Sequence, residues 1–400
     1  MPNLKRVKAQ PPRLRGASIA FVGEAPGVDE ALTGKPFVGA AGRLFGLTRE
    51  DRYESYNYAM SILGQAGIER ETALVTNVFE ERPPENNVQH FFMKRGDFKK
   101  AKLESPYPVN GTRGYLRPEF DAEITRLKSE LEAENPNIIV ALGATALWAL
   151  TGFHKITEHR GTITANSLLP LNKALPTYHP AAVLRQYNWF PIVVADLVKA
   201  VRESKYPEVR RPNRLVRVAE TADEVEKYCG LFKAAPLLGC DVETKYHQIS
   251  TIGFAPNPQD SFVIPIITET GSFWSWNDEQ RVWKAVKKLM EYSPVAKMFQ
   301  NAAFDVLMFN HHGVQVRGVI EDTMIMHHAL QPELQKGLDM LGSLYTDELA
   351  WKNLVKFKAE SAMPKCKVCN NTGGYMYDEN RGKVCEHCCP HDEGRWLLSH

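Results

Sequence analysis

The sequence predicts two consecutive α/β domains followed by a small metal-binding segment. Residues 16–204 alternate short apolar runs with helical patterns, an order typical of a layered fold around a parallel sheet. Residues 216–362 open with strand-like runs and continue with helices, which predicts a mixed α/β domain. Five of the seven cysteines lie between positions 366 and 389. This clustering indicates a metal site rather than a disulfide framework.

The length and charge of the chain limit the number of domains and the class of protein only approximately. Four hundred residues exceed one typical domain, so we expect two or three. The 49 basic and 47 acidic residues give a net charge of +2, which favours no particular partner. No apolar run reaches 18 residues, and the basic start lacks an apolar core. We therefore expect a cytoplasmic protein with neither a membrane span nor a secretory signal.

Three apolar runs predict the buried parallel strands of the first domain, after a basic tail at residues 1–15. They are SIAFVG (18–23), TALVTNV (72–78) and NIIVALG (137–143). Between the last two, apolar residues recur at helical spacing, and Asn135 with Pro136 then ends the helix. The periodic residues are Phe120, Ile124, Leu127 and Leu131.

Residues 86–115 interrupt this alternation. The stretch FFMKRGDFKKAKLES is basic and contains Phe91, Phe92 and Phe98. One interpretation is a solvated surface insertion. The other is a nucleic-acid contact in which the cations neutralise phosphates and the rings stack on bases.

A charged segment with two prolines, residues 205–215, is the expected linker. Beyond it, four runs predict strands and two stretches, near 278–292 and 301–312, predict helices. The strand-like runs are LVRVAE, PLLGCDVET, ISTIGFA and SFVIPI.

Polar side chains follow three strand-like segments of the first domain. Glu24 stands on a glycine-flanked turn, and a carboxylate there can orient water or stabilise a cationic transition state. Phe37 offers a flat face for a planar ring. The amide of Asn77 can donate and accept at a base edge. His179 precedes a proline in a turn that leads into a helix.

Four motifs in order give residues 16–203 a close resemblance to the family 4 uracil-DNA glycosylases. The motifs are GEAPG (23–27), GKPFVGAAG (34–42), TNVFEERPP (76–84) and HPAAVLR (179–185). The resemblance implies a three-layer α/β fold. It also implies that Phe37 stacks on a flipped uracil and that Asn77 forms hydrogen bonds with the base-pairing edge of this uracil. His179 would donate a hydrogen bond to the uracil oxygen that gains negative charge as the base leaves.

The same resemblance assigns further positions. Ala25 joins the uracil-binding residues, and Leu184 and Arg185 lie near the DNA groove. Glu24, Glu30 and Asn86 match positions linked to catalysis or to water placement. A carboxylate near the sugar would stabilise an oxocarbenium-like transition state.

The chain departs from this family at the cysteines that hold an iron–sulfur cluster. Glu81 and Leu116 occupy two of the expected cysteine positions, and no cysteine precedes Cys229. We therefore expect no iron–sulfur cluster. A glycosylase fold retained only for binding uracil or DNA is the alternative to an active enzyme.

The second domain carries two pairs of oxygen-bearing side chains. Asp241 and Glu243 are two residues apart on a strand, and Asn301 and Asp305 are four apart on a helix, so each pair shares a face. Carboxylates gathered in this way bind divalent metals, usually Mg²⁺. Two such ions can promote phosphodiester hydrolysis.

This stretch resembles the 3′–5′ proofreading exonuclease of DNA polymerase I, an RNase H-like fold of the DEDD type. The matching segments are ISTIGFA, NAAFDVLMFNHHGVQVRGVIEDTMIMHHAL and LDMLGSLYTDE. The resemblance implies that Asp241, Glu243 and Asp305 bind Mg²⁺ or Mn²⁺, and that Asn301 lies beside them and contacts DNA. No YxxxD motif follows Asp305, and we interpret the HxxxxD formed by His387 and Asp392 as coincidence. We expect residues 393–400 to be a truncated continuation, with the missing motif and a polymerase domain beyond residue 400 or in trans.

Residues 363–392 predict a zinc-ribbon-like insertion. Cys366, Cys369, Cys385 and Cys388 form CxxC-x15-CxxC, a tetrahedral sulfur set for Zn²⁺. His387, Cys389 and His391 are alternative ligands, and a redox role is the alternative chemistry.

Together these patterns predict a phage-like DNA repair and replication protein, located in the host cytoplasm and acting on single-stranded or uracil-containing DNA. It would combine uracil excision with a metal-dependent 3′–5′ exonuclease. The alternatives are a non-catalytic DNA-binding module attached to a polymerase, and an adaptor that recruits partners through zinc.

Overall fold

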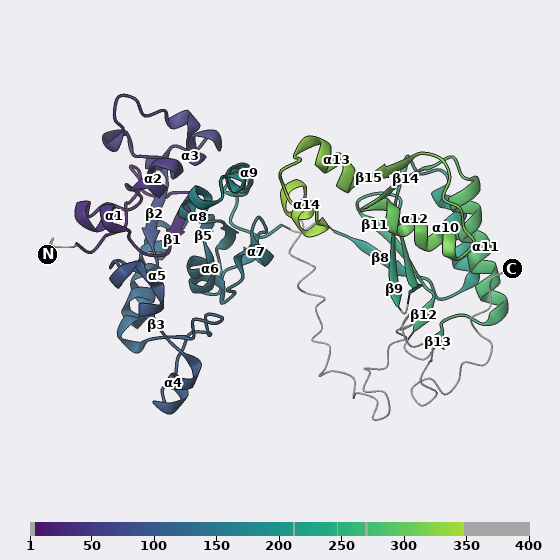
Figure 1. The fold of residues 1–400 in the computed structure, drawn as a ribbon, viewed down its shortest axis with the longest axis horizontal. Helices are drawn as coiled ribbons and strands as arrows, with labels where there is room; N and C mark the ends of the chain where they lie inside the picture. The colour runs from purple at the N-terminus through teal and green to yellow at the C-terminus, as the bar shows by residue number, and fades with distance from the viewer. Residues whose placement is uncertain (1–4, 211–212, 246, 269–270, 348–400) are drawn as a thin grey trace, which may run out of the picture. The chain divides into compact units, whose positions relative to one another are not determined.

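The computed structural model describes residues 5–210, 213–245, 247–268 and 271–347, which form two compact units (Figure 1). Among the described residues, unit 1 contains 5–210 together with 333–347, and unit 2 contains the residues between them. Residues 333–347 were expected in the second domain, yet they pack with unit 1. No described helix is long and apolar enough to cross a membrane.

Unit 1 is built on a five-stranded sheet of order β2-β1-β5-β7-β6, parallel except for the edge strand β6. These strands are β1 Ile19–Gly23, β2 Leu74–Asn77, β5 Ile138–Leu142, β6 Thr164–Ala165 and β7 Lys173–Thr177. Strands β1, β2, β5 and β7 are fully buried, because helices cover both faces of the sheet. The three strands expected from the sequence are confirmed.

Successive strand residues point to opposite faces of this sheet and so feed two separate cores. Phe21, Val75 and Val140 pack on one side with α9 and α3. Ala20 and Ile139 pack on the other side with α5 and α6. Unit 1 is therefore a three-layer α/β/α fold. Its helices are α1 Val28–Thr33, α2 Ala40–Phe45, α3 Ile62–Gln65, α4 Arg95–Lys100, α5 Asp121–Glu134, α6 Ala144–Thr151, α7 Ile156–His159, α8 Pro180–Arg185, α9 Phe190–Glu203 and α14 Leu338–Tyr345.

The helix expected after Phe120 is α5. It ends at Asn135, which adopts the left-handed conformation with φ 45° before Pro136. Short 3₁₀ turns complete the unit: η1 Arg49–Asp51, η2 Tyr58–Met60, η3 Arg70–Thr72, η4 Pro84–Asn86, η5 Val88–Phe91, η6 Pro118–Phe120 and η7 Tyr187–Trp189.

Helix α14 closes one face of unit 1 although it lies more than a hundred residues beyond α9. Leu334, Met340 and Leu341 are buried in the core that also holds α9. The ammonium of Lys199 on α9 donates to the carbonyls of Ser343 and Thr346, 2.5 and 2.9 Å away, at the end of α14. This is the favourable placement for a cation at a helix C-terminus.

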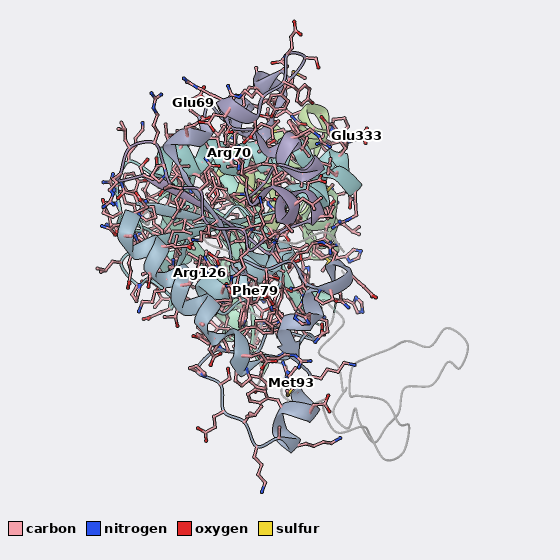
Figure 2. All side chains as sticks on the ribbon, turned by 90° about the vertical axis from the view of Figure 1, so that its left-hand side faces the viewer. Glu69, Arg70, Phe79, Met93, Arg126 and Glu333 are labelled. Atoms are coloured by element: carbon pink, nitrogen blue, oxygen red, sulfur yellow. The ribbon has the colours of Figure 1, made fainter. Side chains whose placement is uncertain are left out.

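An arm, residues 92–116, projects from unit 1. It consists of β3 Phe92–Met93, α4 and β4 Tyr115–Leu116, with β3 and β4 antiparallel. Figure 1 shows α4 extending beyond the layers of unit 1, and Figure 2 places Met93 at its root.

The aromatic residues of this region do not face solvent. Phe91 stacks on Phe79 with ring centroids 3.7 Å apart, Phe92 meets Trp148 edge-on, and Phe98 stacks on Tyr115. All three are buried. The interpretation that these rings stack on DNA bases is therefore wrong, because their apolar faces are needed to root the arm in the core.

Unit 2 contains a six-stranded mixed sheet of order β15-β14-β9-β10-β11-β8. Its strands are β8 Leu215–Val218, β9 Leu237–Lys245, β10 Gln248–Ala255, β11 Asp260–Pro265, β14 Ala296–Phe299 and β15 Ile320–Asp322, with a small pair β12 Ile267–Thr268 and β13 Gly271–Ser272. Its helices are α10 Ala222–Phe232, α11 Trp276–Tyr292, α12 Ala302–His311 and α13 Thr323–Leu330.

The sequence expectation for unit 2 missed α10, so the order of four strands before any helix was wrong. A capping box marks its start: Thr221 accepts from the backbone of Glu224, and the Glu224 carboxylate accepts from Thr221. Val225, Cys229 and Phe232 then supply a buried face at helical spacing. The four strands and the helices α11 and α12 lie where they were expected.

Candidate active sites

The loop of unit 1 that carries Glu24, Ala25 and Phe37 begins where β1 ends. Gly23 pairs in register with Asn77 of the neighbouring parallel strand β2. A Cβ atom added to Gly23 would lie 2.6 Å from Cζ of Phe37 and closer still to Oδ1 of Asn77. Glycine is therefore required here so that the Phe37 ring and the Asn77 amide can converge over the end of the strand.

Contacts to the backbone of Phe37 fix the position of its ring. Phe37 lies in the left-handed region with φ 51°, a backbone conformation that aromatic residues rarely adopt. The Glu30 carboxylate accepts from the backbone N–H groups of Phe37 and Gly27. In this structure Glu30 thus fixes the loop that presents the ring, rather than facing an open site.

A second buried group supports the same loop from below. The guanidinium of Arg70 donates to the carbonyls of Phe37 and Gly46 at 2.8 Å and of Pro36 at 2.5 Å. Arg70 is completely buried, and burial lowers its pKa to about 10, so it remains cationic at neutral pH. The sequence analysis did not identify this residue, which is labelled in Figure 2.

Asn77 lies at the end of β2, and its side chain is 3% exposed. Among the described residues, no group accepts a hydrogen bond from its Nδ2. The Arg126 guanidinium on α5 donates to the carbonyls of Asn77 and Val78, at 2.8 and 2.9 Å, and so fixes the strand end. Arg126 is a second positioning residue that the sequence analysis missed.

His179 forms the third side of this site. Its ring centroid lies 5.7 Å from that of Phe37, and Gly143 at the end of β5 leaves room for it. Nδ1 of His179 accepts the N–H of Ala181 at 3.1 Å, at the start of α8. Burial lowers the pKa of His179 to about 4, although the negative charge of Glu24 opposes this shift. The imidazole is therefore neutral at pH 7, with its proton on Nε2.

Glu24 is engaged by two side chains. Its Oε2 accepts from the hydroxyl of Thr145 on α6, and Nη1 of Arg113 lies 3.3 Å away. The same Nη1 also donates to the Thr145 hydroxyl. Arg113 comes from the arm, and the sequence analysis did not assign it to a site.

The remaining expected residues surround this site at different depths. Ala25 is half-buried beside Glu24. Leu184, which is 47% exposed, and Arg185, which is also exposed, lie at the end of α8, the helix that begins directly after His179. Asn86 is exposed on η4 and adopts a left-handed conformation with φ 58°.

The acidic residues of unit 2 meet around β9. Asp241 and Glu243 are exposed on one face of this strand, and Oδ1 of Asp305 on α12 accepts the N–H of Val242 between them at 3.0 Å. Burial, with the charge of Asp241 adding to it, raises the pKa of Asp305 to about 6. Desolvation and the charge of Glu243 raise the pKa of Asp241.

Asn301 adopts a left-handed conformation at the start of α12, with φ 66°. Asp322 at the end of β15 accepts the N–H groups of Asn301 and Ala302 at 3.1 and 2.8 Å, and so holds the turn that precedes Asp305. The sequence analysis did not identify Asp322.

Two observations bear on metal binding in this chain. In the portion that the structure describes, no three acidic, histidine or cysteine side chains are gathered closely enough to hold an ion. The mutual repulsion of Asp241, Glu243 and Asp305 nevertheless fits a divalent cation, which would relieve it. The proposed zinc ligands Cys366, Cys369, Cys385 and Cys388 lie outside the described residues.

Residues 13–199 match the model of the uracil DNA glycosylase superfamily. The type-4 uracil-DNA glycosylase of Thermotoga maritima is 31% identical over 185 residues, which cover 46% of this chain and 75% of that protein. The chain belongs to the uracil DNA glycosylase superfamily. The type-4 enzyme of Archaeoglobus fulgidus is 33% identical, over 42% of this chain and 67% of its own length.

Residues 216–363 of this superfamily member match the 3′–5′ exonuclease model of the DNA polymerase A type, so the chain joins a glycosylase-type domain to an exonuclease-type domain. Among solved structures, Escherichia coli RNase D aligns at 17% identity and a TM-score of 0.26, over 34% of each chain. Brucella melitensis NrnC, solved with bound Mg²⁺, aligns at 16% identity and a TM-score of 0.24, over 33% of this chain and 61% of its own.

Proposed function

We propose that unit 1 binds a uracil base flipped out of DNA and hydrolyses its N-glycosidic bond. The observation that carries this proposal is the buried amide of Asn77, whose Nδ2 has no acceptor among the described residues. A buried donor without an acceptor costs about 1–3 kcal/mol, so such a group is retained where a ligand completes it. The amide matches the O4 and N3–H edge of uracil, since it donates and accepts at once.

Phe37 would stack on the same base, while the Glu30 and Arg70 contacts hold its backbone in place. Flipping a base out of the stack costs a few kcal/mol, and stacking on an aromatic ring recovers about 1–3 kcal/mol per base. Ala25 lies beside this loop. The exposed Leu184 and Arg185 are suited to fill the gap in the duplex and to contact its backbone.

His179 would stabilise the leaving group. When the C1′–N1 bond breaks, both electrons remain with the base, and negative charge develops on its O2. The Nε2 proton of a neutral His179 donates a hydrogen bond to that oxygen, because Nδ1 is already occupied by the Ala181 N–H. A fixed donor aimed at developing charge is worth about 3–4 kcal/mol.

Glu24 would act on the sugar. Its carboxylate stabilises the positive charge that develops at C1′ and accepts a proton from the water that adds there. The Thr145 hydroxyl orients this carboxylate. Asn86 is a further candidate for water placement, although it has no contact with Glu24 in this structure.

For unit 2 we propose metal-dependent 3′–5′ exonuclease activity of the kind that accompanies a family A DNA polymerase. Asp241, Glu243 and Asp305 would hold Mg²⁺ or Mn²⁺, which supplies a nucleophilic hydroxide and stabilises the leaving oxygen. The Val242 N–H fixes the Asp305 carboxylate over β9, and Asn301 stands at the turn where a DNA strand would pass.

The test uses 5′-labelled single-stranded DNA with one internal uracil. We expect abasic sites in EDTA, lost in Asn77→Ala and in His179→Ala. We expect 3′–5′ shortening in Mg²⁺, lost in Asp241→Ala. The unit 1 variants should keep the 3′–5′ shortening and Asp241→Ala should keep uracil release, so each set of variants is a control for correct folding of the other unit. Full uracil release by both unit 1 variants would contradict the glycosylase proposal.

One observation favours a second candidate, a uracil-binding module that does not cut. Arg113 and Thr145 already occupy Oε2 of Glu24, so this oxygen is engaged by the protein and not held ready for a water molecule. Tight, uracil-dependent binding without any abasic product would favour this alternative.

A further inference from the structure

The arm, residues 92–116, carries a group of cations with no anionic partner. Its two ends lie in the buried hairpin β3–β4, and Trp148 anchors it further by donating from Nε1 to the Pro108 carbonyl at 2.8 Å. The arm is therefore a folded element fixed to the core. The residues exposed at its far end, on α4, are not the residues that anchor it to the core.

The far end is strongly basic. Five exposed cations stand between positions 94 and 102, where Asp97 is the one acidic residue, and Glu104 follows two positions later. Within the described part of the chain none of these five forms an ion pair. They are Lys94, Arg95, Lys99, Lys100 and Lys102.

Two exposed lysines on other helices of unit 1 provide a comparison. Lys128 pairs with Glu132 on α5, and Lys155 pairs with Glu158 on α7. Cations left without anions over one projecting element produce a local positive potential, which attracts phosphates.

The root of the arm brings a further cation to the base-binding site. Arg113 reaches Glu24 with Nη1, while its Nε and Nη2 donate to no other described residue. Its side chain is 33% exposed, and neither Nε nor Nη2 is among the buried polar atoms without a partner, so both nitrogens are accessible to solvent. The planar fork of a guanidinium matches the geometry of a phosphate.

We propose that the arm is a clamp for the phosphodiester backbone of the DNA strand that presents the flipped base. This inference rests on the proposed function of unit 1 and extends it. The lysines of α4 contact phosphates of the strand away from the lesion. Arg113 contacts the phosphate beside the flipped nucleotide with Nε and Nη2, and simultaneously holds Glu24 toward the sugar.

Binding of DNA without uracil tests the far end of the arm. The probe is a covalently closed single-stranded DNA circle, bound by the full-length protein in EDTA, so that no 3′ end is offered to unit 2. Lys99→Ala/Lys100→Ala is compared with Lys128→Ala/Lys155→Ala, which removes the same charge from paired positions.

We expect weaker binding for the α4 double variant only, with a salt dependence reduced by about 1.4 in log Kd against log salt. Raising salt from about 0.05 to 0.2 M would then shrink its difference from wild type by about sevenfold. Equal salt slopes for the two double variants would overturn the assignment. Because the circle contains no uracil, this result does not depend on whether the wild type excises uracil.

The contact proposed for Arg113, at the root of the arm, is tested by uracil release from the same DNA circle carrying one uracil. We expect Arg113→Gln to raise KM by about tenfold or more, and Arg113→Lys to recover part of this loss, because lysine keeps the charge without the fork. A lowered kcat with unchanged KM in Arg113→Gln would show that Arg113 acts only on Glu24 and would refute the phosphate contact. Absence of release by the wild type refutes the glycosylase proposal instead.

Discussion

Replacing Gly23 by alanine is expected to impair uracil release strongly while leaving the fold of unit 1 intact. The new methyl carbon would lie 2.6 Å from Cζ of Phe37 and would also overlap Oδ1 of Asn77. Carbon atoms in contact prefer separations of about 3.5–4.0 Å, so the ring must retreat by about 1 Å. The backbone of Gly23 is not in the left-handed region, and alanine itself is therefore tolerated.

A displacement of about 1 Å in a positioned group costs about a hundredfold in rate. We therefore expect kcat/KM for uracil release to fall by about two orders of magnitude. Overpacking in the fully buried strand β1 should cost about 1–3 kcal/mol of stability, which thermal unfolding measures. Gly230→Ala on α10 is the matched control, because nothing lies within 4 Å of its added carbon.

A double-mutant cycle sharpens this test. If the alanine acts through the base-binding residues, Gly23→Ala should cost much less in an Asn77→Ala background than in the wild type. Wild-type uracil release by a folded Gly23→Ala protein would refute the idea that Phe37 and Asn77 form the base site.

Three further predictions concern pH, a buried cation and a distant helix. Burial lowers the pKa of His179 from 6.5 to about 4, so the unfolded chain binds the proton first and the free energy of unfolding should fall as the pH drops from 6.5 toward 4. The rate of uracil release should stay constant through pH 6.5. A fall in this rate with a midpoint near pH 6.5 would contradict a neutral His179. Arg70→Met leaves the carbonyls of Pro36, Phe37 and Gly46 without their donors. It should cost about 2–4 kcal/mol in denaturant unfolding and raise KM for uracil DNA, and an unchanged KM would show that the loop is held without Arg70. Leu341→Ala should cost about 2–4 kcal/mol and lower the melting temperature of unit 1, since Leu341 is buried in the core around α9; an effect confined to unit 2 would contradict the placement of α14.

The parallel strands of unit 1 could be predicted because both faces of the sheet are buried, which leaves uninterrupted apolar runs. The motif residues Phe37, Asn77 and His179 could also be predicted to share a site, since they follow strands whose carboxyl ends meet at one edge. The structure does bring their side chains together around Gly23.

The supporting cations could not be predicted in the same way. Arg70, Arg113 and Arg126 act on backbone carbonyls or on a carboxylate far away in the sequence, and no local pattern reports such partners. The basic and aromatic stretch at 86–115 was ambiguous for a related reason. Composition shows that rings and cations are interleaved, but only packing shows that the rings point inward.

Helix α14 has a consequence for how the protein is made. The last described residue of unit 1 before unit 2 is 210, and the chain returns to unit 1 at residue 333. Residues 204–337 separate α9 from the helix that covers it, and at roughly 5–20 residues per second a ribosome needs about 7–27 s to synthesise them. During this time the apolar face of α9 is uncovered, and the ammonium of Lys199 lacks two of its three carbonyl acceptors. The first domain to emerge is thus completed only after the second has been translated.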